Sequence, residues 1–198
     1  MAEALTEIAR RPPLGEIAAG LTAGIDPGVL DIRLLPPRAR FTLRVAPALL
    51  PGGGEVAGFA LDMAINRCRT TAQRMALRLG PDEWLLWAPE PEAAGIAAGV
   101  AGALAGRHFS LVDIGQGRAA FAVSGTAAAS VLNSGCPLDL SPAAFPAGAA
   151  TRTLVGKCEV VLARMDDGAT FEVECGRSFA PYLRDFLIDA ARELRARG

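Results

Sequence analysis

Residues 74–87, RMALRLGPDEWLLW, carry the pattern that decides the fold, because they predict two strands joined by a tight turn. Met75 and Leu77 alternate with Arg74 and Arg78, which is typical of a strand with one buried face. The next residues, Gly80-Pro81-Asp82, have the chemistry of a turn, and 84–87 form a second apolar strand. Pro91 then opens a helix that runs to about residue 105. The segment predicts an antiparallel hairpin followed by a helix.

The second half of the chain repeats this arrangement. Predicted strands at 158–164 and 171–175 flank a turn at 166–168, and a helix follows whose apolar residues recur at helical spacing from Phe179 to Leu194. Upstream, the alternating strand at 41–45 corresponds to a strand at 119–123. The sequence therefore predicts an internal duplication of a βαββα unit, an α+β fold with helices on antiparallel sheets.

The duplication predicts how the chain divides. We expect residues 1–39 to form an irregular N-terminal arm, 40–107 the first half and 108–198 the second half, together one compact domain. The second half would open with a strand at 108–114, before the turn at 115–117. A short helix at 127–133 is expected to be capped by Thr126 and to end at a left-handed Gly135.

Charge and composition exclude several classes of protein. The chain has 198 residues, with 20 Lys and Arg against 21 Asp and Glu, a net charge of -1, so the basic field of a nucleic-acid-binding protein is not expected. The longest apolar run, 93–105, is too short and too rich in Ala and Gly to span a membrane. The start, Met1-Ala2-Glu3-Ala4, has no export pattern, so the expected location is cytoplasmic.

Few residues are suited to catalysis, and we predict neither a catalytic residue nor a metal site. His108 lies at the start of a predicted strand, where we expect a surface or capping role. Cys136 follows a helix end, whose dipole disfavours a thiolate. The four cysteines (Cys68, Cys136, Cys158 and Cys175) lack the paired spacing of a zinc site or a redox dithiol, which predicts free thiols.

The remaining polar clusters predict turns and surfaces. The glycines at 52–54 and 115–117 fit neither a phosphate loop nor a dinucleotide motif. The acid pairs 82–83 and 166–167 lie on equivalent turns, and Asp113 is expected to pair with Arg118 across its turn. Arginines at 67, 69, 74 and 78 form either a docking face or a solvated one. This inventory favours a binding or assembly role over an independent enzyme.

Several stretches together resemble the gamma-subunit family of heterotetrameric sarcosine oxidases. They are LGPDEWLL at 79–86, VDIGQGR at 112–118, GCPLDL at 135–140, and FEV at 171–173 with RSFAPYL at 177–183. The resemblance makes the motif residues candidates for family-specific or interface roles. These candidates are Gly80, Pro81, Asp82, Glu83, Trp84, Gly135, Cys136, Pro137, Leu138, Asp139, Arg177, Ser178 and Phe179.

The resemblance also implies a fold and a function. The family is similar to the folate-binding domain of aminomethyltransferases, which is built from duplicated ferredoxin-like units. It implies a non-catalytic subunit that docks on the large alpha subunit of an alpha-beta-gamma-delta complex, which demethylates sarcosine oxidatively to glycine. FAD, FMN, NAD, tetrahydrofolate and zinc would be held by other subunits, and this chain would bind no cofactor.

Three alternatives stay open at this point. Related N-methyl amino acid dehydrogenases use a similar small subunit. A folate-binding one-carbon protein would need a cavity between the halves, with Asp166, Asp167 or Glu172 directed inward. A free-standing structural module would show a uniformly polar surface. An assembly subunit instead predicts an exposed Trp84 or Trp87, or an uncovered arginine face at 67–78, because interfaces favour Trp and Arg.

Overall fold

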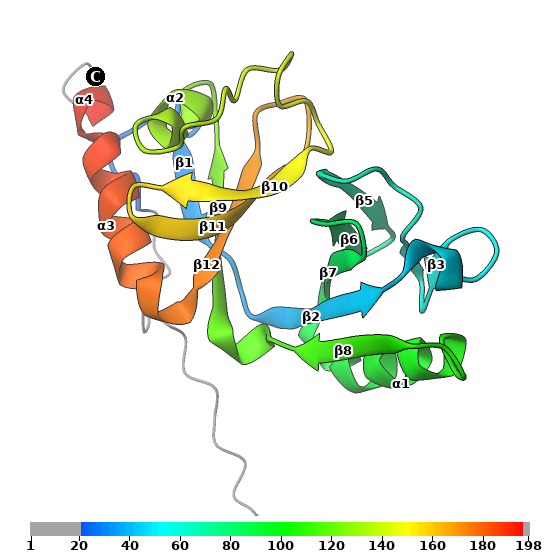
Figure 1. The fold of residues 1–198 in the computed structure, drawn as a ribbon. Coiled ribbons are helices and arrows are strands. Elements are labelled where there is room, and N and C mark those ends of the chain that lie inside the picture. The colour runs from blue at the N-terminus through cyan, green and yellow to red at the C-terminus, as the bar shows by residue number, and fades with distance from the viewer. Residues whose placement is uncertain (1–20, 196–198) are drawn as a thin grey trace, which may run out of the picture.

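The computed structural model describes residues 21–195. Two five-stranded antiparallel sheets lie against each other, and helices cover their outer faces (Figure 1). In order across the first sheet, the strands are β5 (Arg67–Thr71), β6 (Arg74–Arg78), β7 (Glu83–Pro89), β2 (Arg38–Val45) and β8 (Phe109–Asp113). Across the second, they are β10 (Ala150–Val155), β11 (Cys158–Arg164), β12 (Phe171–Gly176), β9 (Arg118–Ser124) and β1 (Asp31–Leu34).

Helices and short elements complete the two units. The helices are α1 (Ala93–Ala103), on the first sheet, and α2 (Ala128–Asn133), α3 (Ala180–Ala190) and α4 (Arg192–Arg195), on the second. The remaining elements are the hairpin of β3 (Glu55–Val56) and β4 (Phe59–Ala60) and the 3-10 turns η1 (Pro47–Leu49), η2 (Glu90–Glu92), η3 (Gly115–Gly117) and η4 (Arg177–Phe179). None of the helices within residues 21–195 combines the length and apolar character needed to cross a membrane.

The duplicated α+β fold expected from the sequence is confirmed. In each unit a strand, a helical segment, a hairpin and a second helix follow in the same order, and the hairpin strands occupy matching places in the two sheets. In the first unit the helical segment between the first strand and the hairpin is only the turn η1, where the second unit has α2. Pro51 and the three glycines after it leave no room there for a longer helix.

The edge strands are exchanged relative to the expected halves. Strand β8, at the start of the expected second half, pairs with β2 in the first sheet. The matching place in the second sheet is taken by β1, which pairs with β9. The expected irregular arm is therefore partly ordered, because Asp31–Leu34 completes the second sheet; residues 1–20 of that arm lie outside the described part of the chain.

Both faces of the central strands are buried, which explains their continuous apolar runs. On β7, Trp84 and Leu86 pack beneath α1, whereas Leu85 and Trp87 face the second sheet. The inter-sheet core that results is small. It consists of Met75, Leu77, Leu85, Trp87, Ala150, Val161 and Ala163.

Two equivalent arginines are a further mark of the duplication. Arg78 donates hydrogen bonds to the carbonyls of Met63, Gly80 and Pro81 and lies 5.0 Å from the Trp84 ring. Arg164, at the same place in the second hairpin, donates to the carbonyls of Leu140, Phe145 and Asp166 and lies 5.3 Å from the Phe171 ring. Each guanidinium thus ties the long loop of its unit to the hairpin turn.

Two local expectations are wrong. Helix α2 begins at Ala128 after Ala127, and no side chain caps it, so Thr126 does not act as the cap; its amide bonds to Gly28 O instead. Gly135 does not have a positive φ. It is needed for a close approach, because an added Cβ would lie 2.5 Å from Phe186 Cζ and 2.6 Å from Gly156 N.

We predict that Gly135→Ala lowers the free energy of unfolding by about 1–3 kcal/mol, because the new methyl group overpacks the contact with α3 and the β10–β11 turn. Gly95→Ala on α1 is the matched control, since nothing lies within 4 Å of an added Cβ there; it should stabilise by up to about 1 kcal/mol. Urea unfolding followed by tryptophan fluorescence measures both. Equal stabilities for the two variants would contradict this account.

Candidate functional site

Strands β2, β9 and β12 place charged side chains between the two sheets. On β2, Phe41 and Leu43 pack in the core beneath α1, so alternation turns Arg38 and Arg40 toward the second sheet. On β12, Phe171, Val173 and Cys175 pack beneath α3, and alternation turns the two glutamates of the strand toward the first sheet. Arg118 opens β9 on the same side. We call Arg38, Arg40, Arg118, Glu172 and Glu174 the inter-sheet charge cluster.

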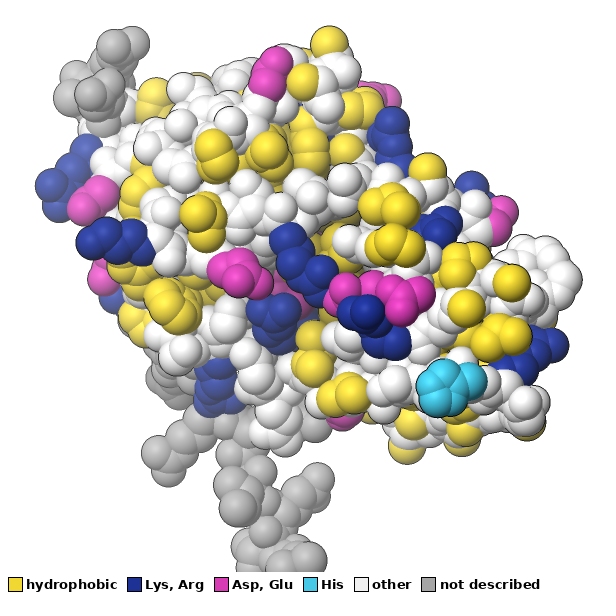
Figure 2. Space-filling model, viewed as in Figure 1, with side chains coloured by type: hydrophobic (Ala, Val, Ile, Leu, Met, Phe, Trp, Pro, Cys, Tyr) yellow, Lys and Arg dark blue, Asp and Glu magenta, His cyan; other side chains and the backbone are white. Residues whose placement is uncertain are grey.

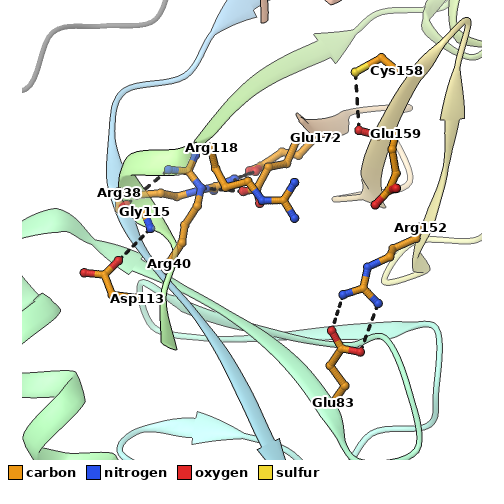
Figure 3. Close-up of polar contacts among 11 residues, drawn as sticks. Arg38, Arg40, Glu83, Asp113, Gly115, Arg118, Arg152, Cys158, Glu159 and Glu172 are labelled. Carbon is orange, nitrogen blue, oxygen red and sulfur yellow. Dashed lines mark hydrogen bonds and ion pairs between the residues drawn. The ribbon is translucent and has the colours of Figure 1, made fainter. Parts of the chain in front are cut away.

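The members of the cluster form a continuous network (Figure 3). Arg38 Nη2 lies 2.5 Å from Glu172 Oε2, and Arg40 Nε lies 2.6 Å from Glu174 Oε2. The other oxygen of Glu174, Oε1, is 3.6 Å from Arg118 Nε. The cluster thus links β2 of the first unit to β9 and β12 of the second, and it holds three arginines against two glutamates.

Burial dominates the electrostatics of this network. Arg40 is 1% exposed and Glu174 is completely buried. Burial lowers the pKa of Arg40, and the charge of Glu174 opposes that shift. The Arg38 guanidinium also stacks 3.8 Å from the Trp87 ring centre. A buried pair of this kind is destabilised strongly when one partner is removed.

The inter-sheet charge cluster borders two hollows on the surface of the described part of the chain. One is a groove of about 670 Å³ beside Arg38, Glu172, Met75 and Trp87, with Pro36, Pro37, Pro89 and Pro91 among its other lining residues. The other is a recess of about 690 Å³ beside Arg118, lined also by Thr42, Asp113, Ile114, Gln116 and Gly117. Arg40 and Glu174, being buried, line neither opening.

A second set of ion pairs lies at the surface, and one of them joins the two units. Arg152 on β10 donates hydrogen bonds to both carboxylate oxygens of Glu83 on β7, and Arg44 pairs with Glu83 and Asp82. The hydrogen bond from Arg152 is the main cause of a lowered pKa at Glu83. In Figure 2 basic and acidic side chains form a band across the middle of the molecule, between hydrophobic ones.

The model of the "Sarcosine oxidase, gamma subunit family" matches residues 46–193. The chain belongs to this family. A sarcosine oxidase subunit gamma from Corynebacterium sp. (strain P-1) is 30% identical over 191 residues, which span 93% of this chain and 91% of that protein. A second one, from Arthrobacter sp., has the same identity and coverage.

Solved structures agree with this assignment. A chain of the heterotetrameric sarcosine oxidase from Corynebacterium sp. U-96, in complex with pyrrole 2-carboxylate, matches with a TM-score of 0.81 and 28% identity, over 94% of this chain and 96% of that one. The glycine cleavage system aminomethyltransferase T from Bartonella henselae shares the fold, with a TM-score of 0.54 and 16% identity over 78% of this chain and 44% of that one.

The motif residues of the gamma-subunit family lie mostly in turns and in the core. Gly80 and Pro81 join β6 to β7, where their carbonyls accept hydrogen bonds from Arg78. Trp84 is completely buried, and its Nε1 donates to Leu61 O. Trp87 is 1% exposed. The expectation of an exposed tryptophan at an interface is therefore wrong for both.

The motif at 135–139 shapes the loop after α2. Cys136 is buried, and Asn133 Nδ2 donates hydrogen bonds to the carbonyl oxygens of Cys136 and Leu138. Asp139 accepts a hydrogen bond from the Ser141 amide, which lowers the pKa of its carboxyl. Pro137 is exposed at the bend between them.

The motif at 177–179 forms η4, at the start of α3. There Ser178 is exposed and Phe179 is 47% exposed. Turn η4 contacts η3, so the family motifs at 112–118 and 177–183 meet in space. The side chain or backbone of Arg177 also interacts with another part of the folded chain.

The arginines at positions 67, 69, 74 and 78 do not form one continuous surface. Arg69 pairs with Asp62 at 2.6 Å, and Arg74 pairs with Glu92 at 2.7 Å. Arg78 is directed into the fold as described above, whereas Arg67 is exposed on the edge strand β5. The expected Asp113–Arg118 ion pair is also wrong, because Asp113 accepts from the Gly115 amide and Arg118 approaches Glu174.

The three folate candidates are not brought together. Glu172 lies between the sheets and pairs with Arg38. Asp166 stays in its turn and accepts from the Thr170 amide, which lowers the pKa of the carboxyl, and Asp167 is exposed. Among the described residues there is no group of three or more His, Cys, Asp and Glu that could hold a metal ion. The four cysteines are free, and burial raises the pKa of Cys68 to about 11.

The sequence did not identify the inter-sheet charge cluster as a site. Arg40 and Glu174 occupy the polar positions of alternating strands, a pattern that is equally typical of a strand with one face in water. One signal was available: the pairs Arg38–Glu172 and Arg40–Glu174 both join residues 134 apart, with opposite charges at equal spacing. Because Arg38 belongs to the predicted arm, this spacing becomes informative only once β2 is known to begin there.

We predict that Glu174→Gln lowers the free energy of unfolding by about 3–5 kcal/mol, because Arg40 is left as an uncompensated buried charge. The double variant Arg40→Met/Glu174→Leu should recover most of this loss, since it removes both charges and keeps apolar volume. Urea unfolding measures both variants. If the free energy of unfolding of Glu174→Gln lies within about 0.5 kcal/mol of that of the parent chain, the ion pair is not required for the structure.

The lowered pKa of Glu83 predicts an acid-dependent contribution to stability. The Glu83–Arg152 pair stabilises the fold fully above the unfolded-state pKa of about 4.3, and the contribution is lost as pH falls through the lower folded-state pKa. Glu83→Gln should therefore reduce stability at pH 7 by roughly 1 kcal/mol or less and flatten the loss below pH 4. Melting temperatures from pH 3 to 7 test this; parallel curves would contradict it.

Proposed function

We propose that this chain is the non-catalytic gamma subunit of a heterotetrameric sarcosine oxidase. It would dock on the large alpha subunit of an alpha-beta-gamma-delta complex and support oxidative demethylation of sarcosine to glycine. The observation that carries the proposal is the match to a chain of a heterotetrameric sarcosine oxidase along nearly its whole length, with a TM-score of 0.81. The family match over residues 46–193 supports it independently.

The arrangement of charged residues suits an assembly role. The glutamates between the sheets are engaged by arginines of the same chain, and Glu83 is engaged by Arg44 and Arg152. These groups fix the two units against each other, which gives a rigid body with defined surfaces. His108 is exposed and lines a shallow recess with Arg44, Asp82 and Phe109, which fits a surface role.

The chemistry of the complex would then belong to its other subunits. FAD, FMN, NAD, tetrahydrofolate and zinc would be held there, and the complex would work in the cytoplasm. The motif residues at 80–84 and 135–139 would shape the subunit from within, because they lie mainly in turns and core positions. Phe179, which is 47% exposed, is the member of the motif set best placed to contact a partner directly.

We predict that co-expression with the larger subunits of the host's sarcosine oxidase gives a complex that contains this chain and turns over sarcosine. Omitting the chain should lower the yield of assembled, flavin-containing enzyme at least about tenfold. His108→Ala should retain complex yield and turnover within about twofold, because an exposed side chain outside the reacting centre contributes little. Gel filtration, flavin absorbance and sarcosine-dependent peroxide formation are the measurements.

Two outcomes would contradict the proposal. Recovery of the larger subunits as a fully active complex without this chain would exclude an assembly role. Loss of more than about 100-fold in turnover for His108→Ala, with assembly intact, would place this residue in the chemistry. Turnover of another N-methyl amino acid in place of sarcosine would assign the chain to a related dehydrogenase complex.

A further inference from the structure

Strand β8 has an open hydrogen-bonding edge. The Ile114 amide donates to Arg40 O at 2.9 Å, and the register pairs Val112 with Thr42 and Ser110 with Arg44. Backbone groups alternate in direction along an antiparallel strand. The bond at Ile114 therefore means that the amides and carbonyls of residues 110 and 112 face β2. Those of residues 109, 111 and 113 point away from the sheet. Among residues 21–195, these outward groups have no backbone partner.

The outward edge also lacks the features that usually protect such strands. Its sequence, Phe-Ser-Leu-Val-Asp, contains no proline and no lysine. The corresponding strand of the other sheet, β1, differs, because Ile32 O accepts a bond from the Leu21 amide. Val112 is 52% exposed and shares the Thr42 face of the sheet. The edge therefore presents both main-chain groups and an apolar side chain.

The charge beside β8 indicates what the occupant carries. The recess lined by Thr42 and Arg118 begins where β8 ends. The Arg118 side chain is 23% exposed, and Glu174 is its one ion-pair partner in the described chain. Because the inter-sheet charge cluster holds three arginines and two glutamates, one positive charge is uncompensated within it. Asp113 also borders the recess, but it pairs with Phe41, so its side chain leaves β8 on the face of the sheet opposite Thr42.

We propose that β8 is the docking strand for an extended acidic segment of a larger partner subunit, which adds to the first sheet as a sixth strand. Its backbone pairs with residues 109, 111 and 113, as in other cases of strand addition. A carboxylate on the residue opposite Val112 lies on the Thr42 face and pairs with Arg118. This inference rests on the proposed function, since it names the surface by which the subunit docks.

A second copy of this chain does not fit the same edge. The residues of β8 on the Thr42 face are Ser110 and Val112, neither of which is acidic. A copy paired through its own β8 would satisfy the main-chain groups but would bring no carboxylate to Arg118 from that strand. The charge therefore favours a partner of different sequence.

The first test compares Leu111→Pro with Leu111→Ala, each co-expressed with the larger subunits. Proline removes an amide that points away from the sheet, so the β2–β8 ladder stays intact, and both variants lose the same partly buried side chain. Leu111→Pro should lower the recovery of the alpha subunit, identified by mass spectrometry, about tenfold or more relative to Leu111→Ala. The melting temperatures of the two isolated chains should agree within about 5 °C. Equal recovery would overturn the inference.

Hydrogen exchange of the unmodified chain tests the same point without a variant. The amides of 109, 111 and 113 should exchange at least about tenfold more slowly in the complex than in the isolated chain. As a separate check, Arg118→Ala should lower recovery most at low salt, where an ion pair is least screened. Unchanged exchange, or slow exchange in a homodimer of the isolated chain, would overturn the inference. If the unmodified chain recovers no larger subunit at all, the proposed function itself fails.

Discussion

The buried contact between Arg40 and Glu174 is the constraint on which the rest of the structure depends. The central strands are buried on both faces, so the inward-facing charges of Arg40 and Glu174 must find their counter-charge on the opposite sheet. With both charges present, the small apolar core between the sheets requires these pairs to be in register. The position of one unit on the other therefore depends on the ion pairs and on apolar packing together.

The exchange of β1 and β8 adds a covalent element to this arrangement. Relative to the expected halves, each sheet takes its edge strand from outside its own half, so the chain crosses between the sheets twice, from β1 to β2 and from β8 to β9. The ion pair at Glu83 and Arg152 connects the units again at the surface. The gamma-subunit fold thus consists of two units with similar structure that chain crossings and ion pairs join into one body. Such a body suits a subunit that offers a fixed surface to its partners.

Local patterns in the sequence were sufficient for the duplicated hairpins and the helices. The predicted strands at 158–164, 171–175 and 119–123 and the helix after Arg177, from its apolar stripe, all form. An alternation of apolar and polar residues does not reveal whether the polar face of a strand contacts water or another sheet. The roles of Arg40 and Glu174 were therefore missed. Strand β1 was missed because its partner β9 is distant in the sequence. Strand β10 was missed although it pairs locally with β11 across the Gly156–Lys157 turn. The role of Gly135 was missed because only the folded chain brings Phe186 against it.

The exchanged strand β1 has a consequence for synthesis on the ribosome. It leaves the exit tunnel early, but its partner β9 begins only at Arg118, ~80 residues later. At ~5–20 residues per second the interval is roughly 4–16 s, during which Ile32 and its neighbours have no sheet to join. Vectorial folding of the first unit must therefore proceed while an apolar segment upstream of it remains unpaired.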